Sequence, residues 1–173
     1  IKQMSRDKKV LFDAFTLRSL SDKSYEKRKA AAFEIENVIR QLSSHPGSGT
    51  YINTMITTLI TDYAFSSQPN SRKGGLIGLS SIAIALMGHS TPYLELILPP
   101  ILRCFIDVDA RVRYYACEAM YNIAKIVRGD ILLYFNELFD GLCKLTSDKD
   151  ADVRSATLLF DRLLKDIVSS SSI

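Results

Sequence analysis

The sequence has few of the residues from which metal, disulfide and catalytic sites are built. Its two histidines, His45 and His89, have no second ligand at metal-site spacing, and neither pairs locally with a nucleophile. Its three cysteines, Cys104, Cys117 and Cys143, are odd in number and fall inside apolar helical patterns. This favours reduced core thiols and a reducing compartment over a disulfide framework. We therefore expect no enzymatic activity, no metal and no cofactor.

Charge of one sign and long apolar runs are also scarce. The net charge of +3 is mild and gives no reason to expect a nucleic acid partner. The uncharged stretch Gly74–Met87 is shorter than the roughly 20 residues of a membrane span, so it predicts a buried helix. Its opening GGLIG lacks the ending of a phosphate loop, and we expect these small residues to let two helices approach closely. Ile1–Lys9 is polar and charged, which predicts that no secretory leader opens the chain.

The strongest pattern that the sequence does contain is a repeat of about 41 residues, a period typical of HEAT-type helical pairs. The pentapeptide DARVR at 109–113 returns as DADVR at 150–154, so Arg154 stands one period after Arg113. Arg72 stands one period before Arg113, and Arg28 stands slightly more than one period before Arg72. The repeat therefore predicts stacked pairs of helices, and we call the two helices of a pair A and B.

The predicted fold is all-α, a HEAT-repeat right-handed α-solenoid of about four antiparallel helix pairs. We expect a single domain over residues 1–173, with pairs at about 8–42, 50–88, 91–128 and 130–168. Solenoids need a capped terminus for solubility, and the chain finishes in Ser169–Ser172 without a polar capping helix. We therefore expect this chain to be an N-terminal fragment of a longer repeat protein.

Apolar residues at steps of three and four predict which face of each helix is buried. The clearest case is the third B-helix, within Asp107–Val127. The predicted buried positions are Leu11, Ala14, Phe15 and Leu20; Ala31, Ile35, Val38 and Leu42; Ile52, Met55, Ile56, Leu59, Ile60 and Tyr63; Ala116, Met120, Ile123 and Val127; and Ile131, Phe135, Leu138, Leu142 and Leu145.

The last B-helix departs from its template. A shift of one full period from the third B-helix would bury Asp161, and an unpaired buried carboxylate is costly. We therefore expect a shift that is one residue shorter, which leaves Leu158 and Leu159 facing a further repeat or a partner. The shorter shift buries Ala156, Phe160, Leu163 and Ile167 in place of Thr157, Asp161 and Leu164.

Glycine and proline predict several helix ends. We expect Gly88 to end the second B-helix in a left-handed conformation. Thr91 should cap the following helix with Pro92 in its first position. Pro99 and Pro100 should interrupt and bend the third A-helix, because proline removes a backbone donor and clashes with the preceding turn.

An arginine opens each predicted B-helix. These arginines could reach acidic residues and carbonyls of the preceding turn, which favours a structural ladder between repeats over a ligand site. The ladder residues are Arg28, Arg72, Arg113, Arg154, Asp22, Asp109 and Asp150. The basic helix starts at 27–29 and 72–73 could instead contact anionic lipid, although a solvated helix start is more frequent. Phe33 lies opposite its buried face, covered by Ile1–Phe15 or exposed as an anchor.

Stacked pairs leave a continuous concave face, built mainly from B-helices, on which a partner can lie. On the third B-helix this face is rich in tyrosine and arginine, the residue types that dominate interface energetics. For Tyr115 and Tyr121, packing against neighbouring repeats is an equally good interpretation. The predicted partner-binding residues are Lys73, Arg111, Tyr114, Tyr115, Glu118, Tyr121, Asn122, Lys125, Leu158 and Leu159.

Four segments carry a specific resemblance to one family. They are SDKSYEKRKAAAFEIE at 21–36, NSRKGGLIGLSSIAIAL at 70–86, RVRYYACEAMYNIAKIVRG at 111–129 and FDRLLKDIV at 160–168. They resemble the N-terminal HEAT repeats of the vacuole-morphology scaffold of the phosphatidylinositol 3-phosphate 5-kinase complex. The strings RKGGLIGL and RYYACEA are far more specific than a general HEAT pattern, and the resemblance runs from about Phe15 to near the end of the chain.

This resemblance implies a non-enzymatic scaffold, peripheral on the cytoplasmic face of vacuolar or endolysosomal membranes, that helps to control phosphatidylinositol 3,5-bisphosphate. It implies that these repeats bind the lipid kinase, with other armadillo-type vacuolar adaptors as further candidates. A Sac-type phosphoinositide phosphatase would bind the C-terminal part of the scaffold. The residues alone leave two alternatives open: a peripheral membrane-lipid binding domain, and an importin-like or other armadillo/HEAT cargo-binding module. A mixed, slightly basic concave face disfavours the importin-like carrier.

Overall fold

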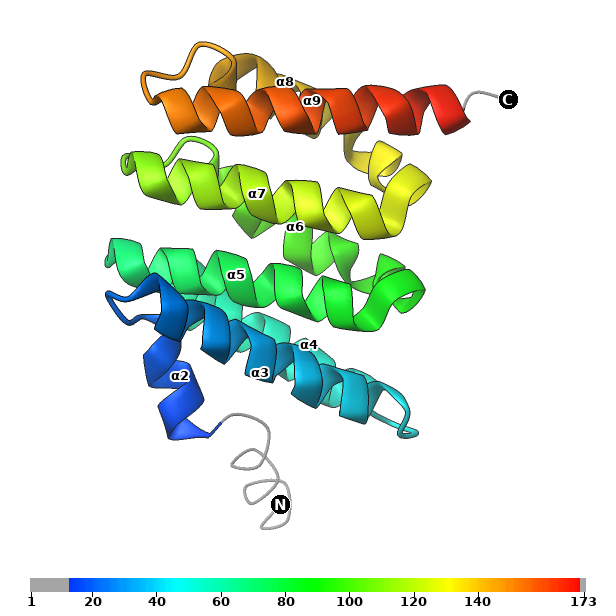
Figure 1. The fold of residues 1–173 in the computed structure, drawn as a ribbon. Helices are drawn as coiled ribbons and strands as arrows, with labels where there is room; N and C mark the ends of the chain where they lie inside the picture. The colour runs from blue at the N-terminus through cyan, green and yellow to red at the C-terminus, as the bar shows by residue number, and fades with distance from the viewer. Residues whose placement is uncertain (1–12, 172–173) are drawn as a thin grey trace. The chain divides into compact units, whose positions relative to one another are not determined.

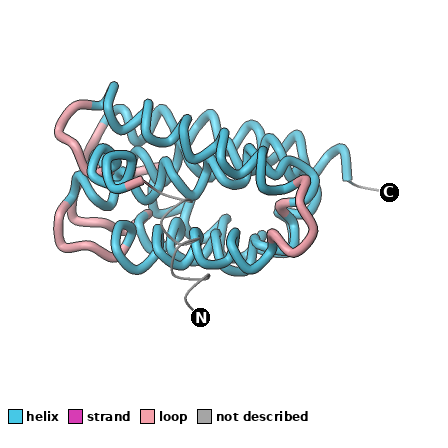
Figure 2. The backbone as a smooth tube through the Cα atoms, turned by 90° about the horizontal axis from the view of Figure 1, so that it is seen from below, coloured by secondary structure: helices cyan, strands magenta, loops and turns pink. Residues whose placement is uncertain are grey.

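The structure is a computed structural model that describes residues 13–171, and every regular element in this range is helical (Figure 1; Figure 2). The all-α class predicted from the sequence is therefore confirmed. The chain divides between Leu86 and Met87 into two compact units. The single domain over residues 1–173 stays a prediction.

The first unit is built around two long neighbouring helices. It contains α2 (Ala14–Leu20), α3 (Tyr25–Ser43), α4 (Gly49–Thr58), the π-helical turn η1 (Leu59–Ala64) and α5 (Pro69–Leu86). Helix α5 packs along α3 and also contacts α2 and η1 (Figure 1). The core between them includes the almost completely buried side chains Leu20, Ile35, Ile39, Ile56 and Leu76.

The second unit repeats this arrangement around α7 and α9. It contains η2 (Met87–His89), η3 (Thr91–Tyr93), α6 (Leu94–Cys104), α7 (Ala110–Val127), η4 (Arg128–Tyr134), α8 (Phe135–Leu145) and α9 (Ala151–Ser171). Helix α7 packs along α9 on one side and contacts α6 on another (Figure 1). The predicted buried face of α7 is confirmed, because Ala116, Met120, Ile123 and Val127 are all buried.

Aspartate caps explain why the acidic pentapeptides repeat. The Asp109 carboxylate accepts from the backbone N–H groups of Arg111 and Val112 at 2.8 and 3.1 Å. One period later, the Asp150 carboxylate accepts from the same two positions of α9 at 2.9 and 3.0 Å. Such a cap satisfies backbone donors that the first turn of a helix leaves without partners. The repeated aspartates therefore fix where α7 and α9 begin.

Helix α2, the first helix of the described residues, begins later than the predicted pair start near residue 8. The Asp13 cap places its start at Ala14. Leu20 is buried as predicted, whereas Ala14 is exposed and Phe15 is 71% exposed. The second buried position is Thr16, one turn before Leu20. Leu11, a predicted core residue, lies outside the described residues.

Two predicted core residues of η1, Ile60 and Tyr63, are only half-buried. The Tyr63 hydroxyl donates to the Leu17 carbonyl at 2.8 Å, so this side chain ties η1 to α2 instead of entering the core completely. A tyrosine at such a position can keep its ring partly covered and its polar end hydrogen-bonded.

Four other predicted core positions are wrong. In α3, Val38 and Leu42 are only half-buried, because the helix turns Ile39 into the core instead. In α8, Phe135 is exposed and stacks on a neighbouring aromatic ring. Cys143 is also exposed, although Cys104 and Cys117 are buried thiols as predicted.

Helix α9 keeps the full-period register that the sequence argued against. Thr157 and Leu164 are buried, whereas Ala156 and Leu163 are only half-buried. The Thr157 hydroxyl donates to the Val153 carbonyl at 2.7 Å, so its burial leaves the hydroxyl hydrogen-bonded. The buried positions of α9 are Val153, Thr157, Phe160, Leu164 and Ile167.

The cost that we assigned to Asp161 does not arise. Its side chain is half-buried and its carboxylate pairs with Lys165 at 2.7 Å, one turn later on α9. A carboxylate in this position keeps part of its hydration, so it need not be expelled from the helix face. Leu158 and Leu159 lie off the buried face as expected and are 56% and 55% exposed.

The left-handed residue at the end of α5 is Met87, with a φ of 49°, not the predicted Gly88. The chain leaves α5 through the tighter turn η2, which begins one residue before that glycine. The same geometry returns one period later, where Arg128 has a φ of 48° before Gly129. A non-glycine residue at positive φ is strained, yet this turn occurs at equivalent positions of two repeats. In both, the residue before the glycine has a positive φ.

Two further predictions about helix ends are wrong. Ser90, not Thr91, holds the N-cap position of η3, and the Thr91 hydroxyl instead donates to the Asp130 carboxylate at 2.6 Å. Pro99 and Pro100 do not interrupt α6, which runs unbroken from Leu94 to Cys104. The two carbonyls that lose their donors lie one turn earlier, on an exposed part of α6 where water can replace them.

Candidate protein-binding groove

A groove of about 300 Å³ lies between α7 and α9 in the second unit. Its lining comes from one face of each helix, at steps of three and four residues. We call it the α7–α9 groove. Its lining residues are Tyr114, Glu118, Tyr121 and Asn122 from α7, and Asp152, Ser155, Ala156 and Leu159 from α9.

Core packing decides which side chains of α7 reach this groove. Burial of Ala116, Met120 and Ile123 turns the opposite stripe of the helix outward. Glu118 and Asn122, one turn apart on that stripe, make no ion pair or hydrogen bond within residues 13–171. The groove therefore presents polar side chains whose hydrogen-bonding capacity the described residues leave unused.

Arg111 links the two walls at one end of the groove. Its guanidinium carbon lies 4.5 Å from the centre of the Tyr114 ring, and its Nη1 pairs with Asp152 at 2.9 Å. Both members of the ion pair are largely exposed, so the pair contributes little to stability. Tyr114 also meets Tyr115 edge to face, with ring centres 6.0 Å apart. These contacts orient the Tyr114 ring at the groove wall.

Partial loss of solvent shapes the electrostatics of the groove. Removal of water raises the pKa of Glu118, and the nearby Arg111 opposes that rise in pKa. Burial also raises the pKa of Tyr114, assisted by the negative charge of Glu118. At the other end, the Lys125 ammonium lies 5.6 Å from the centre of the Tyr121 ring. The groove thus holds a partly desolvated carboxylate between two tyrosines.

The structure brings five of the predicted partner-binding residues together in the groove lining: Tyr114, Glu118, Tyr121, Asn122 and Leu159. Arg111 and Lys125 contact the groove tyrosines without lining the groove. Tyr115 is only 9% exposed, so its alternative interpretation as a packing residue is the better one. Leu158 is exposed but lies off the groove, and Lys73 belongs to α5 in the first unit.

The sequence reasoning missed three lining residues of α9: Asp152, Ser155 and Ala156. A signal for them exists in the repeat, because one full period carries Arg111 onto Asp152 and Tyr114 onto Ser155. The shorter shift chosen to avoid burying Asp161 hid this correspondence.

The four repeated arginines share one structural contact. In each of them Nη1 donates to the carbonyl six residues earlier, in the turn before its helix. The bonds are Arg28 to Asp22 at 2.8 Å, Arg72 to Ser66 at 3.1 Å, Arg113 to Asp107 at 2.8 Å and Arg154 to Asp148 at 2.6 Å. These bonds hold each turn against the first turn of the helix that follows it.

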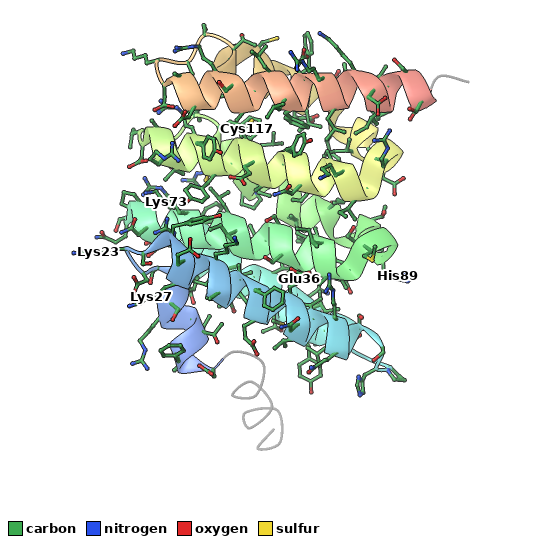
Figure 3. All side chains as sticks on the ribbon, in the orientation of Figure 1. Lys23, Lys27, Glu36, Lys73, His89 and Cys117 are labelled. Atoms are coloured by element: carbon green, nitrogen blue, oxygen red, sulfur yellow. The ribbon has the colours of Figure 1, made fainter. Side chains whose placement is uncertain are left out.

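The basic helix starts of the first unit are poorly placed for lipid. Arg28 is only 4% exposed, which contradicts the idea that it reaches a membrane surface. The Lys27 ammonium forms an ion pair with the Asp22 carboxylate at 3.5 Å. Lys23, Lys27 and Lys73 do lie at the same end of this unit, where α3 and α5 begin (Figure 3). Phe33, which we expected to be covered or to be an anchor, is 59% exposed.

The carboxylate that meets Arg113 is Asp148, not Asp109 or Asp150. The two side chains form a bidentate pair, with Nε to Oδ2 at 2.7 Å and Nη2 to Oδ1 at 2.9 Å. Their side chains are only 16% and 8% exposed. The hydrogen bond from Arg113 lowers the pKa of Asp148 below its ordinary value of 3.8. This pair ties the start of α7 to the turn before α9.

Replacing Asp148 with asparagine tests the contribution of this pair to stability. We expect Asp148→Asn to lower the free energy of unfolding by about 2 kcal/mol at pH 7, because Arg113 loses a charged partner in a poorly hydrated place. Because the folded pKa is depressed, the wild-type advantage is fully present above pH 3.8 and is lost as the pH falls through the folded pKa. Urea unfolding from pH 7 to pH 2 measures this. A stability gap that stayed constant down to pH 2 would contradict the assigned ion pair.

Two other kinds of site do not occur in the described part of the chain. Residues 13–171 contain no group of three or more histidine, cysteine or acidic side chains that could hold a metal ion. None of the helices in that range is sufficiently long and apolar to span a membrane. Cys117 offers no reactive thiolate, because burial raises its pKa to about 12.

Known proteins resemble this chain over most of its length. It is 55% identical over 154 residues to the Protein VAC14 homolog of Arabidopsis thaliana, which covers 89% of this chain and 21% of the relative. It is 51% identical over 154 residues to the Vacuole morphology and inheritance protein 14 of Saccharomyces cerevisiae, covering 88% of this chain and 17% of that relative. The Protein VAC14 homolog of Schizosaccharomyces pombe is 45% identical over 158 residues, covering 90% and 19%. The chain thus spans about a fifth of the length of these relatives.

A solved structure supports the helical-repeat fold. The designed armadillo repeat protein YIII(Dq)4CqI matches with a TM-score of 0.57 and 20% sequence identity, covering 86% of this chain and 63% of that protein. The likeness confirms the predicted α-solenoid class and carries no information on function.

The model of one protein family matches residues 70–166, which include every residue that lines the α7–α9 groove. This match covers more than half of the chain, and it agrees with the relatives found in two yeasts and a plant. The resemblance to the vacuole-morphology scaffold that the sequence segments predicted is confirmed. The chain belongs to the family described as the Vacuolar 14 Fab1-binding region.

Proposed function

We propose that this chain is a protein-binding module of a non-enzymatic scaffold, and that its α7–α9 groove receives the Fab1-type phosphatidylinositol 3-phosphate 5-kinase. The observation that carries the proposal is the coincidence of the groove with the family region named for Fab1 binding, residues 70–166. The family match supports kinase binding within residues 70–166, and the groove offers a surface in that range. Assembly and activation of the lipid kinase complex would follow from this contact.

The chemistry of the groove suits a protein partner. Tyr114 and Tyr121 combine large rings with polar ends, which is the composition of residues that dominate binding energy. Leu159 adds an apolar side chain that is 55% exposed, so a partner can remove it from water. A volume of about 300 Å³ is at the lower limit of small-molecule sites and fits one or two inserted side chains.

The wider role extends the same proposal to the whole scaffold. The yeast relative is named for vacuole morphology and inheritance, which supports a vacuolar setting. In this role the scaffold is peripheral on the cytoplasmic face of the vacuolar or endolysosomal membrane. A Sac-type phosphatase, armadillo-type adaptors and the control of phosphatidylinositol 3,5-bisphosphate belong to the larger assembly, most of which lies outside this chain.

Two adjacent leucines provide a matched test. Leu159→Ala should weaken binding of the purified kinase by about tenfold, because it removes an exposed apolar contact from the groove wall. Leu158→Ala makes the same change at equal exposure but outside the groove, and binding should stay within about twofold. Biolayer interferometry on the immobilised chain measures both affinities. Equal affinities for the two variants would remove the groove from the kinase contact.

A further inference from the structure

The α7–α9 groove is rich in hydrogen-bond acceptors, which suits a cationic ligand. Its lining contains two carboxylates, Glu118 and Asp152, and no lysine or arginine. Arg111 and Lys125, which made the face predicted from the sequence slightly basic, contact the groove tyrosines but do not line the groove. One oxygen of Asp152 is taken by Arg111, whereas Glu118 makes no ion pair within residues 13–171.

We propose that the α7–α9 groove receives an arginine side chain of a protein partner, with its guanidinium against Glu118 and beside the groove tyrosines. The identification of the partner as the kinase rests on the proposed function, but the chemistry of the site does not.

The hydrogen-bonding inventory of the groove matches a guanidinium. An arginine side chain brings five N–H donors in a plane and no acceptor. The groove offers acceptors from the Glu118 carboxylate, the Asn122 amide oxygen, the Ser155 hydroxyl and the phenol oxygens of Tyr114 and Tyr121. These groups are not used in hydrogen bonds within the described part of the chain. A phosphate or carboxylate ligand placed against Glu118 would instead meet a negative charge that no cation of the described residues pairs with.

The chain already shows how such a cation is held. The Arg111 guanidinium stacks over Tyr114 at 4.5 Å and pairs with the Asp152 carboxylate at 2.9 Å, so a ring and a carboxylate together hold it at the end of the groove. Glu118 and Tyr121 offer the same two kinds of group farther along the groove. A planar guanidinium uses both better than an ammonium does, because it can stack and also form paired hydrogen bonds.

The partial desolvation of Glu118 also favours a cationic ligand. The pKa of Glu118 is raised because the groove partly desolvates the carboxylate, and the nearby Arg111 opposes this rise in pKa. An incoming guanidinium would restore the lost stabilisation of the negative charge. The site is thus more complete with a cation than without one.

Capped amino acids test this chemistry without the partner. We would titrate N-acetyl-arginine amide into the 15N-labelled chain and follow amide signals of α7 and α9 by NMR. We expect shifts confined to the groove and a Kd on the order of millimolar. N-acetyl-citrulline amide, which has the same shape without the charge, and N-acetyl-lysine amide should each bind about tenfold more weakly. Equal binding of citrulline would overturn the ionic contact, and equal binding of lysine would overturn the preference for guanidinium.

Two variants locate the contact. Glu118→Gln should weaken binding of N-acetyl-arginine amide by about tenfold, whereas Glu137→Gln, the same change on the exposed face of α8, should leave it unchanged. Arg111→Ala should tighten binding by roughly threefold, because it frees Asp152 and removes a competing cation. An unchanged affinity in Glu118→Gln, or weaker binding in Arg111→Ala, would overturn the proposed site.

Binding measurements with the kinase distinguish a failure of this inference from a failure of the proposed function. If Leu159→Ala weakens kinase binding while Glu118→Gln does not, the groove binds the kinase through something other than arginine, and the inference fails alone. If the arginine probe behaves as expected but the kinase does not bind the chain, the inference stands and the proposed function fails.

Discussion

Met120→Asp should destabilise the second unit by about 5 kcal/mol, enough to unfold it under ordinary conditions. Met120 is completely buried in the middle of α7, a helix that packs against both α6 and α9. An aspartate there must either carry an unpaired charge in an apolar environment or bind a proton at neutral pH, and both are expensive. It also leaves a cavity where the longer methionine side chain stood. Circular dichroism during thermal and urea unfolding of the whole chain measures the loss.

Two controls separate burial from position on the helix. Met120→Leu keeps volume and apolarity at the same site, so it should cost less than about 1.5 kcal/mol. Glu118→Ala lies two residues away on the opposite stripe, exposed and with no ion pair within residues 13–171, so it should change stability by less than about 0.5 kcal/mol. If Met120→Asp and Glu118→Ala melted alike, the assignment of the two faces of α7 would be wrong.

The features that sequence predicts best here are those decided by neighbours along the chain. The buried face of α7 follows from spacings of three and four residues, and its start follows from the Asp109 cap. The same cap at Asp150 begins α9, and both are visible in the repeated pentapeptides. Local hydrogen bonds and periodicity are enough for these elements, so the all-α class and the repeat length could be predicted without a structure.

The register of α9 was missed for a different reason, because the burial rule that rejected it took no account of the local partners of polar side chains. We rejected the full-period register of α9 because it brings Thr157 and Asp161 to the buried face. In the structure, one is satisfied by a carbonyl of its own helix and the other pairs with Lys165 at the surface. Simple burial rules treat any polar residue in a stripe as a penalty, and they overlook such local partners.

The two walls of the groove differ in how well the sequence predicts them. Its α7 wall could be predicted from one amphipathic helix, because the outward stripe is the complement of the buried one. Its α9 wall depends on the register, so an error of one residue hid Asp152 and Ser155. Asp152, the second carboxylate of the site, lies on that wall. The sequence therefore suggested a binding face, but the preference of the groove for a cation could be inferred only from the structure.

Gly74→Ala should lower the free energy of unfolding of the first unit by about 3 kcal/mol or more. A Cβ added at Gly74 would lie 1.9 Å from the carbonyl oxygen of Leu20, where the last turn of α2 crosses α5. Backbone on both sides prevents an easy adjustment, so the two helices must separate and expose the buried Leu20 side chain. The sequence motif that we expected to allow close helix packing does so here.

Intrinsic helix propensity predicts the opposite effect of Gly74→Ala on stability, so the sign of the measured change distinguishes the two. In an isolated helix, alanine would be favoured over glycine by about 1 kcal/mol. Gly78→Ala, one turn further along α5, gains the same propensity but meets only the Leu59 methyl groups at 3.0 and 3.1 Å, which can move. Urea unfolding should therefore place Gly78→Ala close to the wild type and Gly74→Ala far below it. Equal stability of the two variants would mean that α2 does not pack on α5 as closely as the structure shows, since no other difference between the two glycines predicts such a large loss.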